Sequence, residues 1–179
     1  MLFRSLSSFS TGLAGMITTM IGETYFEILD NIGAYFYFPL AIAKESYLKE
    51  GVLSLQVKPV SGSIDQAGGL AFGIRNVGNY FVFRVNTLED NVILFEFLNN
   101  KRLKRASAPA KLSAGQWYHL KVEFSGRRCQ CYLDNVPVID YTAERPLDGY
   151  VGLWTKADAV THFADLVIDS PDHRQVVKF

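Results

Sequence analysis

The stretch Trp117 to Ile139, WYHLKVEFSGRRCQCYLDNVPVI, decides the fold. Apolar and polar residues alternate along residues 118–124, as in a strand with one buried face. A turn at Ser125-Gly126 leads into a second apolar run, and Asp134-Asn135 separates that run from a third. An Asp-Asn pair readily takes the positive φ angles of a tight hairpin. The stretch therefore predicts three antiparallel strands joined by short turns.

The same period of two continues outward from this stretch, from about residue 23 onward. In Val52-Leu-Ser-Leu-Gln-Val-Lys58, the apolar residues at 53, 55 and 57 fall on one face and the polar residues on the other. The third strand of the opening stretch extends over 136–141, and further strands are predicted at 24–29, 35–41, 70–75, 80–86, 92–98, 150–154 and 161–168. No long segment has the period of a helix. We predict an all-β fold, a two-sheet antiparallel jelly-roll sandwich of about ten to twelve strands.

Two connecting segments carry predictions of their own. Residues 41–48 could form a short helical turn. Residues 101–111 are basic and have small residues between the charges, so we expect a solvated loop. A nucleic-acid or polyanion patch is disfavoured there because no aromatic residue is interleaved with the charges.

Length and charge limit the classes of function. A chain of 179 residues suits one domain, which we place at residues 23–179. Residues 1–22 form a separate N-terminal segment, and whether this segment belongs to the domain stays open. Lys plus Arg equals Asp plus Glu at 18 each, so nothing in the net charge attracts nucleic acid. No apolar run approaches the roughly 18 residues of a membrane span, and the N-terminus is a weak signal peptide. We expect a soluble protein and leave export open.

Sites built from cysteine or histidine are not indicated. Cys129 and Cys131 are one residue apart on the same strand face, which suits two buried core residues better than a disulfide or a metal site. The three histidines are scattered, without the arrangement of a catalytic triad. Gly68-Gly69 precedes a strand, so it is no phosphate loop.

Several stretches together resemble a known superfamily. They are Asp65-Gln-Ala-Gly-Gly-Leu, the run from Asn79 to Val92, Tyr132-Leu-Asp and Val151-Gly-Leu-Trp-Thr-Lys-Ala-Asp. In this order they are similar to the concanavalin A-like lectin/glucanase superfamily, and more narrowly to bacterial laminin-G-like jelly-roll domains of unknown function, near the 3-keto-disaccharide hydrolase-like domains. The resemblance covers most of the chain from about residue 35. It implies a jelly roll and, through the lectins, a saccharide ligand.

The glucanases of that superfamily place carboxylates in the pattern Glu-x-Asp-x-x-Glu, and this spacing occurs nowhere in the chain. An acidic pair assembled from different strands stays open, with Glu89, Glu96 or Glu123 as the acid. We therefore expect a non-catalytic module rather than an enzyme.

The predicted ligand site lies on the polar side of the strand 80–86 and on neighbouring loops. Tyr80, Arg84 and Asn86 share one strand face, and Arg75 comes near them across a hairpin. An aromatic ring, guanidinium groups and an amide can stack on a sugar and bond its hydroxyls. An ordinary solvated face is the alternative. The loop residues added to the site are Gln66, Glu89, Asn91, Trp154 and Lys156.

Two details of this site stay open. Trp154 either closes the core or stacks on a sugar, whereas Trp117 is expected to be structural. No cofactor is expected, although the oxygen-rich residues 86–91 could hold calcium with Asp65 or Asp158. The leading prediction is a lectin-like module for an oligosaccharide or polysaccharide, with a divergent glycoside hydrolase and a structural or protein-interaction domain as alternatives.

Overall fold

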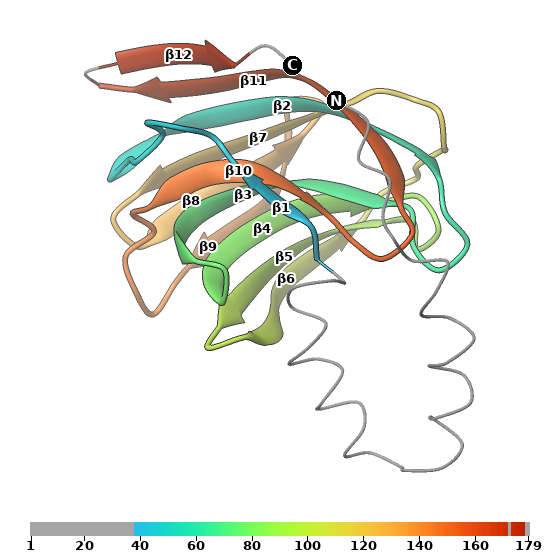
Figure 1. The fold of residues 1–179 in the computed structure, drawn as a ribbon, viewed down its shortest axis with the longest axis horizontal. Helices are drawn as coiled ribbons and strands as arrows, with labels where there is room; N and C mark the ends of the chain where they lie inside the picture. The colour runs from blue at the N-terminus through green and yellow to red at the C-terminus, as the bar shows by residue number, and fades with distance from the viewer. Residues whose placement is uncertain (1–37, 172, 178–179) are drawn as a thin grey trace.

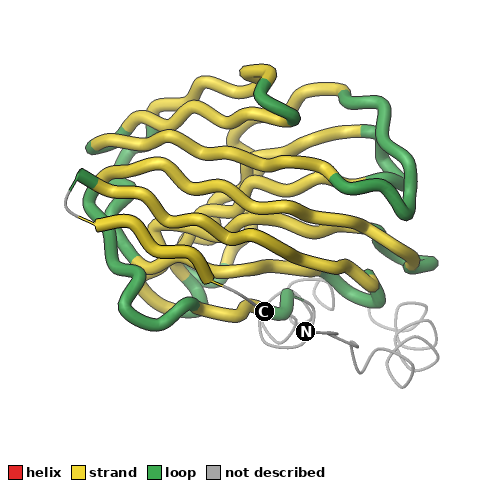
Figure 2. The backbone as a smooth tube through the Cα atoms, turned by 90° about the horizontal axis from the view of Figure 1, so that it is seen from above, coloured by secondary structure: helices red, strands yellow, loops and turns green. Residues whose placement is uncertain are grey.

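The computed structural model describes residues 38–171 and 173–177, and every regular element in them is a strand. The twelve strands form two six-stranded sheets that pack face to face (Figure 1). Figure 2 shows them running side by side, with loops gathered at the two ends. The all-β sandwich is therefore confirmed. No helix among the described residues is long and apolar enough to cross a membrane.

Sheet I has the strand order β1-β10-β3-β4-β5-β6. Its strands are β1 (Leu40–Ile42), β10 (Tyr150–Thr155), β3 (Ala67–Asn76), β4 (Asn79–Asn86), β5 (Asn91–Leu98) and β6 (Lys101–Pro109). Sheet II has the order β12-β11-β2-β7-β8-β9. Its strands are β12 (His173–Val177), β11 (Val160–Ser170), β2 (Glu50–Ser61), β7 (Tyr118–Ser125), β8 (Arg128–Leu133) and β9 (Val136–Thr142). All the strand pairs in both sheets are antiparallel.

The core lies between the sheets and follows the alternation of the sequence. Leu53, Leu55 and Val57 of β2 are fully buried there, in one apolar cluster with Phe81 and Phe83 of β4. Cys129 and Cys131 are buried in the same core as free thiols, as predicted. Burial of so much apolar surface is the main stabilising contribution to such a sandwich.

The structure confirms the hairpin at Asp134-Asn135 and corrects two connecting segments. Asp134 and Asn135 have φ angles of 50° and 67° between β8 and β9. Residues 101–109, predicted to be a loop, form β6, because they pair with β5 at the edge of sheet I. Lys101, Arg102 and Lys104 stay exposed, whereas Arg105 pairs with Glu96. Residues 41–48 form no helical turn; Leu48 makes an isolated bridge to Gly149. The predicted strand 24–29 and the segment 1–22 lie outside the described residues.

Candidate functional site

The outer face of sheet I, where the sequence places the site, is closed. Tyr80, Arg84 and Asn86 do share a face with Val82, but Tyr80 and Asn86 are 1% exposed and Arg84 is 4% exposed. The Tyr80 ring stacks on Phe97 with centroids 4.2 Å apart. Tyr80, Val82 and Phe97 belong to a second apolar cluster that also contains fully buried Trp154. Trp154 therefore packs inside this cluster, and neither an open sugar-binding face nor a solvated one is found here.

Six of the predicted site residues meet in one polar cluster beside the β4–β5 turn. Arg84 donates to Asn91 Oδ1 at 2.6 Å and to Glu89 Oε2 at 2.7 Å. Asn86 donates to Asp65 at 3.2 Å, and Lys156 Nζ lies 2.6 Å from the other Asp65 oxygen. Each charge in this cluster has an opposite charge beside it.

The remaining contacts of this cluster are internal too. Gln66 donates to the carbonyl of Gly62 at 3.0 Å and accepts from Thr87 at 2.7 Å. Burial raises the pKa of Asp65, although the hydrogen bond from Lys156 opposes the rise. Arg75 is not part of the cluster, because it lies at the other end of β3 and pairs with Asp148 at 2.8 Å.

The same contacts bear on the calcium alternative at residues 86–91. Among the residues described, no group of three or more His, Cys, Asp or Glu side chains is placed to hold a metal ion. Asp158 accepts backbone hydrogen bonds from residues 63–65, while Glu89 and Asp65 each pair with a cation. These carboxylates fit a structural role better than a shared ion, and calcium stays an untested alternative.

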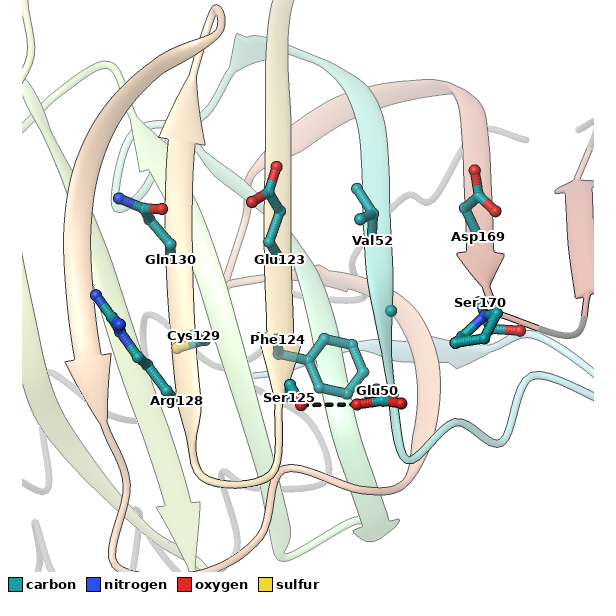
Figure 3. Close-up of a pocket in the computed structure, with 12 residues that line it drawn as sticks. Glu50, Val52, Glu123, Phe124, Ser125, Arg128, Cys129, Gln130, Asp169 and Ser170 are labelled. Carbon is teal, nitrogen blue, oxygen red and sulfur yellow. Dashed lines mark hydrogen bonds between the residues drawn. The ribbon is translucent and has the colours of Figure 1, made fainter.

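The outer face of sheet II differs, because polar side chains are accessible along it. Residues on this face lie side by side on neighbouring strands: Asp169 of β11, Val52 of β2, Glu123 of β7, Gln130 of β8 and Asp140 of β9. The next row contains Glu50, Ser125 and Arg128. Figure 3 shows Gln130, Glu123, Val52 and Asp169 in line across four strands.

All residues of these two rows except Asp140 line a hollow of about 770 Å³ on sheet II (Figure 3). Its polar lining includes the carboxylates of Glu50, Glu123 and Asp169, with the Gln130 amide and the Arg128 guanidinium. Ser125 Oγ donates to Glu50 at 2.7 Å. Val52, Phe124 and Cys129 contribute apolar atoms, and Gly51, Ser170 and Pro171 also line the hollow. The hollow thus combines hydrogen-bond donors and acceptors with apolar surface, as small-molecule sites do.

Contacts within the face hold its side chains in place. Lys121 Nζ lies 2.7 Å from Glu123 Oε1 and 3.9 Å from the centroid of the Tyr132 ring. The Tyr132 hydroxyl lies 2.7 Å from Gln130 Oε1 and 3.1 Å from Glu123 Oε2. The hydrogen bond from Lys121 lowers the pKa of Glu123, so this carboxylate is ionised at neutral pH. Ordering of this kind reduces the entropy lost on binding.

Trp117 just before β7 belongs to the solvent-facing side as well. It is 46% exposed, and Lys58 Nζ lies 4.8 Å from the ring centroid. The expectation that Trp117 is structural is therefore wrong, because Tyr118 is the buried residue of the pair. The alternation of the sequence puts Trp117, His119, Lys121 and Glu123 on one strand face, and this pattern is the sequence signal for the open surface.

The three glutamates considered as catalytic acids lie in unlike settings. Glu96 is buried between Arg105 and Arg145. Burial favours the protonated form of Glu89, but the hydrogen bonds from Arg84 and Asn91, together with the nearby positive charges, outweigh burial and lower the pKa. A glycosidase acid must instead keep its proton near neutral pH. The settings of Glu89 and Glu123 therefore favour acceptors of hydrogen bonds over proton donors.

Comparisons with known proteins show the fold. No family model matches the chain, and no curated protein matches it. The carbohydrate-binding module CBM66 from Bacillus subtilis is similar in structure, with a TM-score of 0.69 and 24% identity over 75% of this chain and 83% of that one. Galectin LEC-6 of Caenorhabditis elegans has a TM-score of 0.56 and 13% identity, covering 75% and 95%. A β-glucanase of Bacillus licheniformis has a TM-score of 0.53 and 10% identity, covering 70% and 69%. The chain therefore has the concanavalin A-like jelly-roll fold that binding modules and hydrolases share.

Proposed function

We propose that this protein is a non-catalytic carbohydrate-binding module that holds an oligosaccharide on the outer face of sheet II. The observation that carries the proposal is the hollow lined by Glu50, Glu123, Arg128, Gln130 and Asp169. The shared fold with a carbohydrate-binding module and with galectins supports the ligand class.

The chemistry of the hollow suits a neutral, hydroxyl-rich ligand. Sugar hydroxyls donate and accept hydrogen bonds, and the hollow offers carboxylate and amide acceptors beside guanidinium and amide donors. Bonds to ionised groups are the stronger kind, and both Glu123 and Asp140 have a lowered pKa because of their hydrogen bonds to Lys121 and Arg128. Cations and carboxylates are interspersed on the face, so it selects neither polyanions nor polycations.

Binding is first measured on a glycan array, with and without calcium, and the best saccharide is then titrated by calorimetry. Gln130→Ala removes an amide from the hollow, and we expect at least a tenfold loss of affinity, about 1.4 kcal/mol. Arg128→Ala should act in the same direction. Both side chains face solvent and lie outside the core, so the fold should persist.

The control variant is Glu89→Gln, which alters the loop cluster that the sequence predicted as the site. It should leave the affinity unchanged. A loss of binding in Glu89→Gln with none in Gln130→Ala would move the site to the loop cluster. Absence of binding to every saccharide would contradict the proposal altogether.

The hydrolase alternative is tested on the same saccharides by release of new reducing ends. Turnover that is abolished by Glu123→Gln or Glu89→Gln, at unchanged binding, would replace the binding module by an enzyme.

A further inference from the structure

The accessible face of sheet II continues beyond the hollow, toward the start of β7. Four outward-facing residues follow one another in this direction: Glu123, Lys121, His119 and Trp117. Each of them is half-buried or exposed, and the residues between them are buried in the core. The outward-facing residues of the neighbouring strand β2, between 52 and 58, are accessible at the same levels. These four residues thus form one accessible row, the β7 strip, with the hollow at one end.

Trp117 lies at the other end of the β7 strip, where its surroundings order the ring and leave it accessible. The residue is 46% exposed, and Lys58 Nζ lies 4.8 Å from the ring centroid. The backbone just before it is tied to β2, because the Gly115 amide donates to the Pro59 carbonyl at 2.7 Å. The next residue, Tyr118, is buried in the core. An ordered indole in solvent offers a ligand apolar contact area at a small cost in conformational entropy.

The distance between the two ends of the β7 strip sets the length of a ligand that uses both. Trp117 comes six positions before Glu123. A strand rises about 3.4 Å per residue, so the two side chains lie about 20 Å apart along the face. A disaccharide in the hollow does not reach Trp117, whereas a tetrasaccharide or a longer chain does.

Groups between the two ends can bond the hydroxyls of such a chain. Tyr132 of β8 lies opposite Lys121, and Gln56 of β2 lies opposite His119. Their phenol, ammonium, amide and imidazole groups donate and accept hydrogen bonds, as sugar hydroxyls require. The core of a protein–protein interface is instead depleted of charge, so the ammonium groups here favour a sugar chain over a protein surface.

We propose that the ligand is an internal stretch of a linear polysaccharide that lies along β7, filling the hollow and stacking one sugar ring on Trp117. This inference rests on the proposed function and adds the class of saccharide, a long unbranched chain rather than a short or terminal sugar. Two contact regions on one ligand raise its affinity, because binding at one holds the chain close to the other. Affinity should therefore increase with chain length until both ends of the β7 strip are occupied.

The test is calorimetry on the full chain with oligosaccharides of increasing length. The probes are cello-, manno- and xylo-oligosaccharides and the series of the saccharide that binds best on the glycan array, each from the disaccharide to the hexasaccharide. In the series that binds, we expect the hexasaccharide to bind about tenfold tighter than the disaccharide, or more. Trp117→Ala should remove most of this gain and should lower the affinity for the disaccharide far less.

Three further variants separate the ring from the rest of the face. Trp117→Phe keeps an aromatic ring and should retain most of the gain with length. Tyr150→Ala is the matched control, because it removes a ring that is 43% exposed on sheet I, and it should leave both affinities unchanged. Gln130→Ala, in the hollow, should weaken the disaccharide and the hexasaccharide alike.

The outcomes distinguish this inference from the proposed function. Equal affinity for all lengths, or equal affinity for the hexasaccharide in Trp117→Ala and its parent, would overturn the inference. The binding module on sheet II would still stand if Gln130→Ala lost affinity. Absence of binding to every probe would contradict the proposed function, and the inference would fall with it.

A second measurement uses the native chain. Of its two tryptophans Trp154 is fully buried, so acrylamide mainly quenches the fluorescence of Trp117. Saturating hexasaccharide should reduce this quenching, because a sugar ring covers the indole, and saturating disaccharide should not. Unchanged quenching with bound hexasaccharide, or an equal reduction by the disaccharide, would overturn the inference.

Discussion

At the scale of single residues, Glu96 is the side chain whose neighbourhood matters most for stability. Its carboxylate is 3% exposed and lies 2.8 Å from Arg105 and 2.9 Å from Arg145. The Arg145 guanidinium also lies 4.5 Å from the centroid of the Phe81 ring. A buried charge needs such partners, since its removal from water is costly.

Glu96→Ala should lower the free energy of unfolding by about 3 to 5 kcal/mol, because two guanidinium groups then lose their shared carboxylate in a buried place. Urea denaturation measures the change. The control is Glu123→Ala, whose pairing with Lys121 is partly exposed and should contribute at most about 1 kcal/mol. Similar losses in both variants would contradict the prediction.

Sequence reasoning could single out Glu96 but not its role. In the alternation along β5, Glu96 falls on the same strand face as Leu94 and Val92. Its partners come from positions 105 and 145, and no local pattern connects them. A catalytic role stayed open for that reason alone.

At the scale of elements, the β8–β9 hairpin is the part that local sequence specifies most completely. Asp134 and Asn135 occupy the left-handed region, which Asn, Asp and Gly tolerate and β-branched residues do not. Asp134 also accepts a hydrogen bond from the His119 amide at 2.8 Å. Two adjacent residues therefore determine the register of two strands.

Asn135→Val should cost about 1 to 2 kcal/mol, because a β-branched side chain is strained at a φ of 67°. Asn135→Gly keeps the angle without that strain and should melt within a few degrees of the parent. Thermal unfolding followed by circular dichroism compares the three proteins. A valine variant as stable as the glycine variant would show that the turn relaxes.

The strand β6 could not be predicted in the same way. Its residues look like a solvated loop because alternation is absent and charges are frequent. It is a strand because β5 offers it a row of backbone partners from Asn91 to Leu98. Pairing with a neighbouring strand outweighed local preference, as it often does in sheets.

At the scale of the whole molecule, sequence patterning predicts two sheets and leaves open which outer face is accessible. Alternation assigns Tyr80 and Arg84 to one face and Lys121 and Glu123 to another, and both assignments are correct. It carries no information on what lies above a face. The predicted site therefore fell on the shielded side of the sandwich.

A hydrogen-bonded link between the β2–β3 loop and the β10–β11 loop makes the fold sensitive to acid. Asp158 follows β10 and accepts backbone hydrogen bonds from Ser63 at 2.6 Å and from Ile64 and Asp65 at 3.0 Å. Burial alone would raise the pKa of Asp158, but these hydrogen bonds outweigh it and lower the pKa. A lowered pKa stabilises the folded state above the unfolded value of about 3.9, and this contribution is lost as the pH falls through the folded pKa.

Asp158→Asn should therefore cost about 1 to 2 kcal/mol at pH 7, since an amide is a weaker acceptor than a carboxylate. The difference from the parent should shrink below about pH 4. Urea denaturation at pH 7 and pH 3 measures both values. An unchanged difference at pH 3 would mean that ionisation of Asp158 does not contribute.

The positive charges on the edge strand β6 affect how copies of the domain behave when they are held close together. Lys101 and Lys104 are exposed on a strand that has a partner on one side only. Two such edges repel each other before their backbones can pair. The domain can therefore be repeated in tandem along one polypeptide, or crowded on a surface, without one copy extending the sheet of the next.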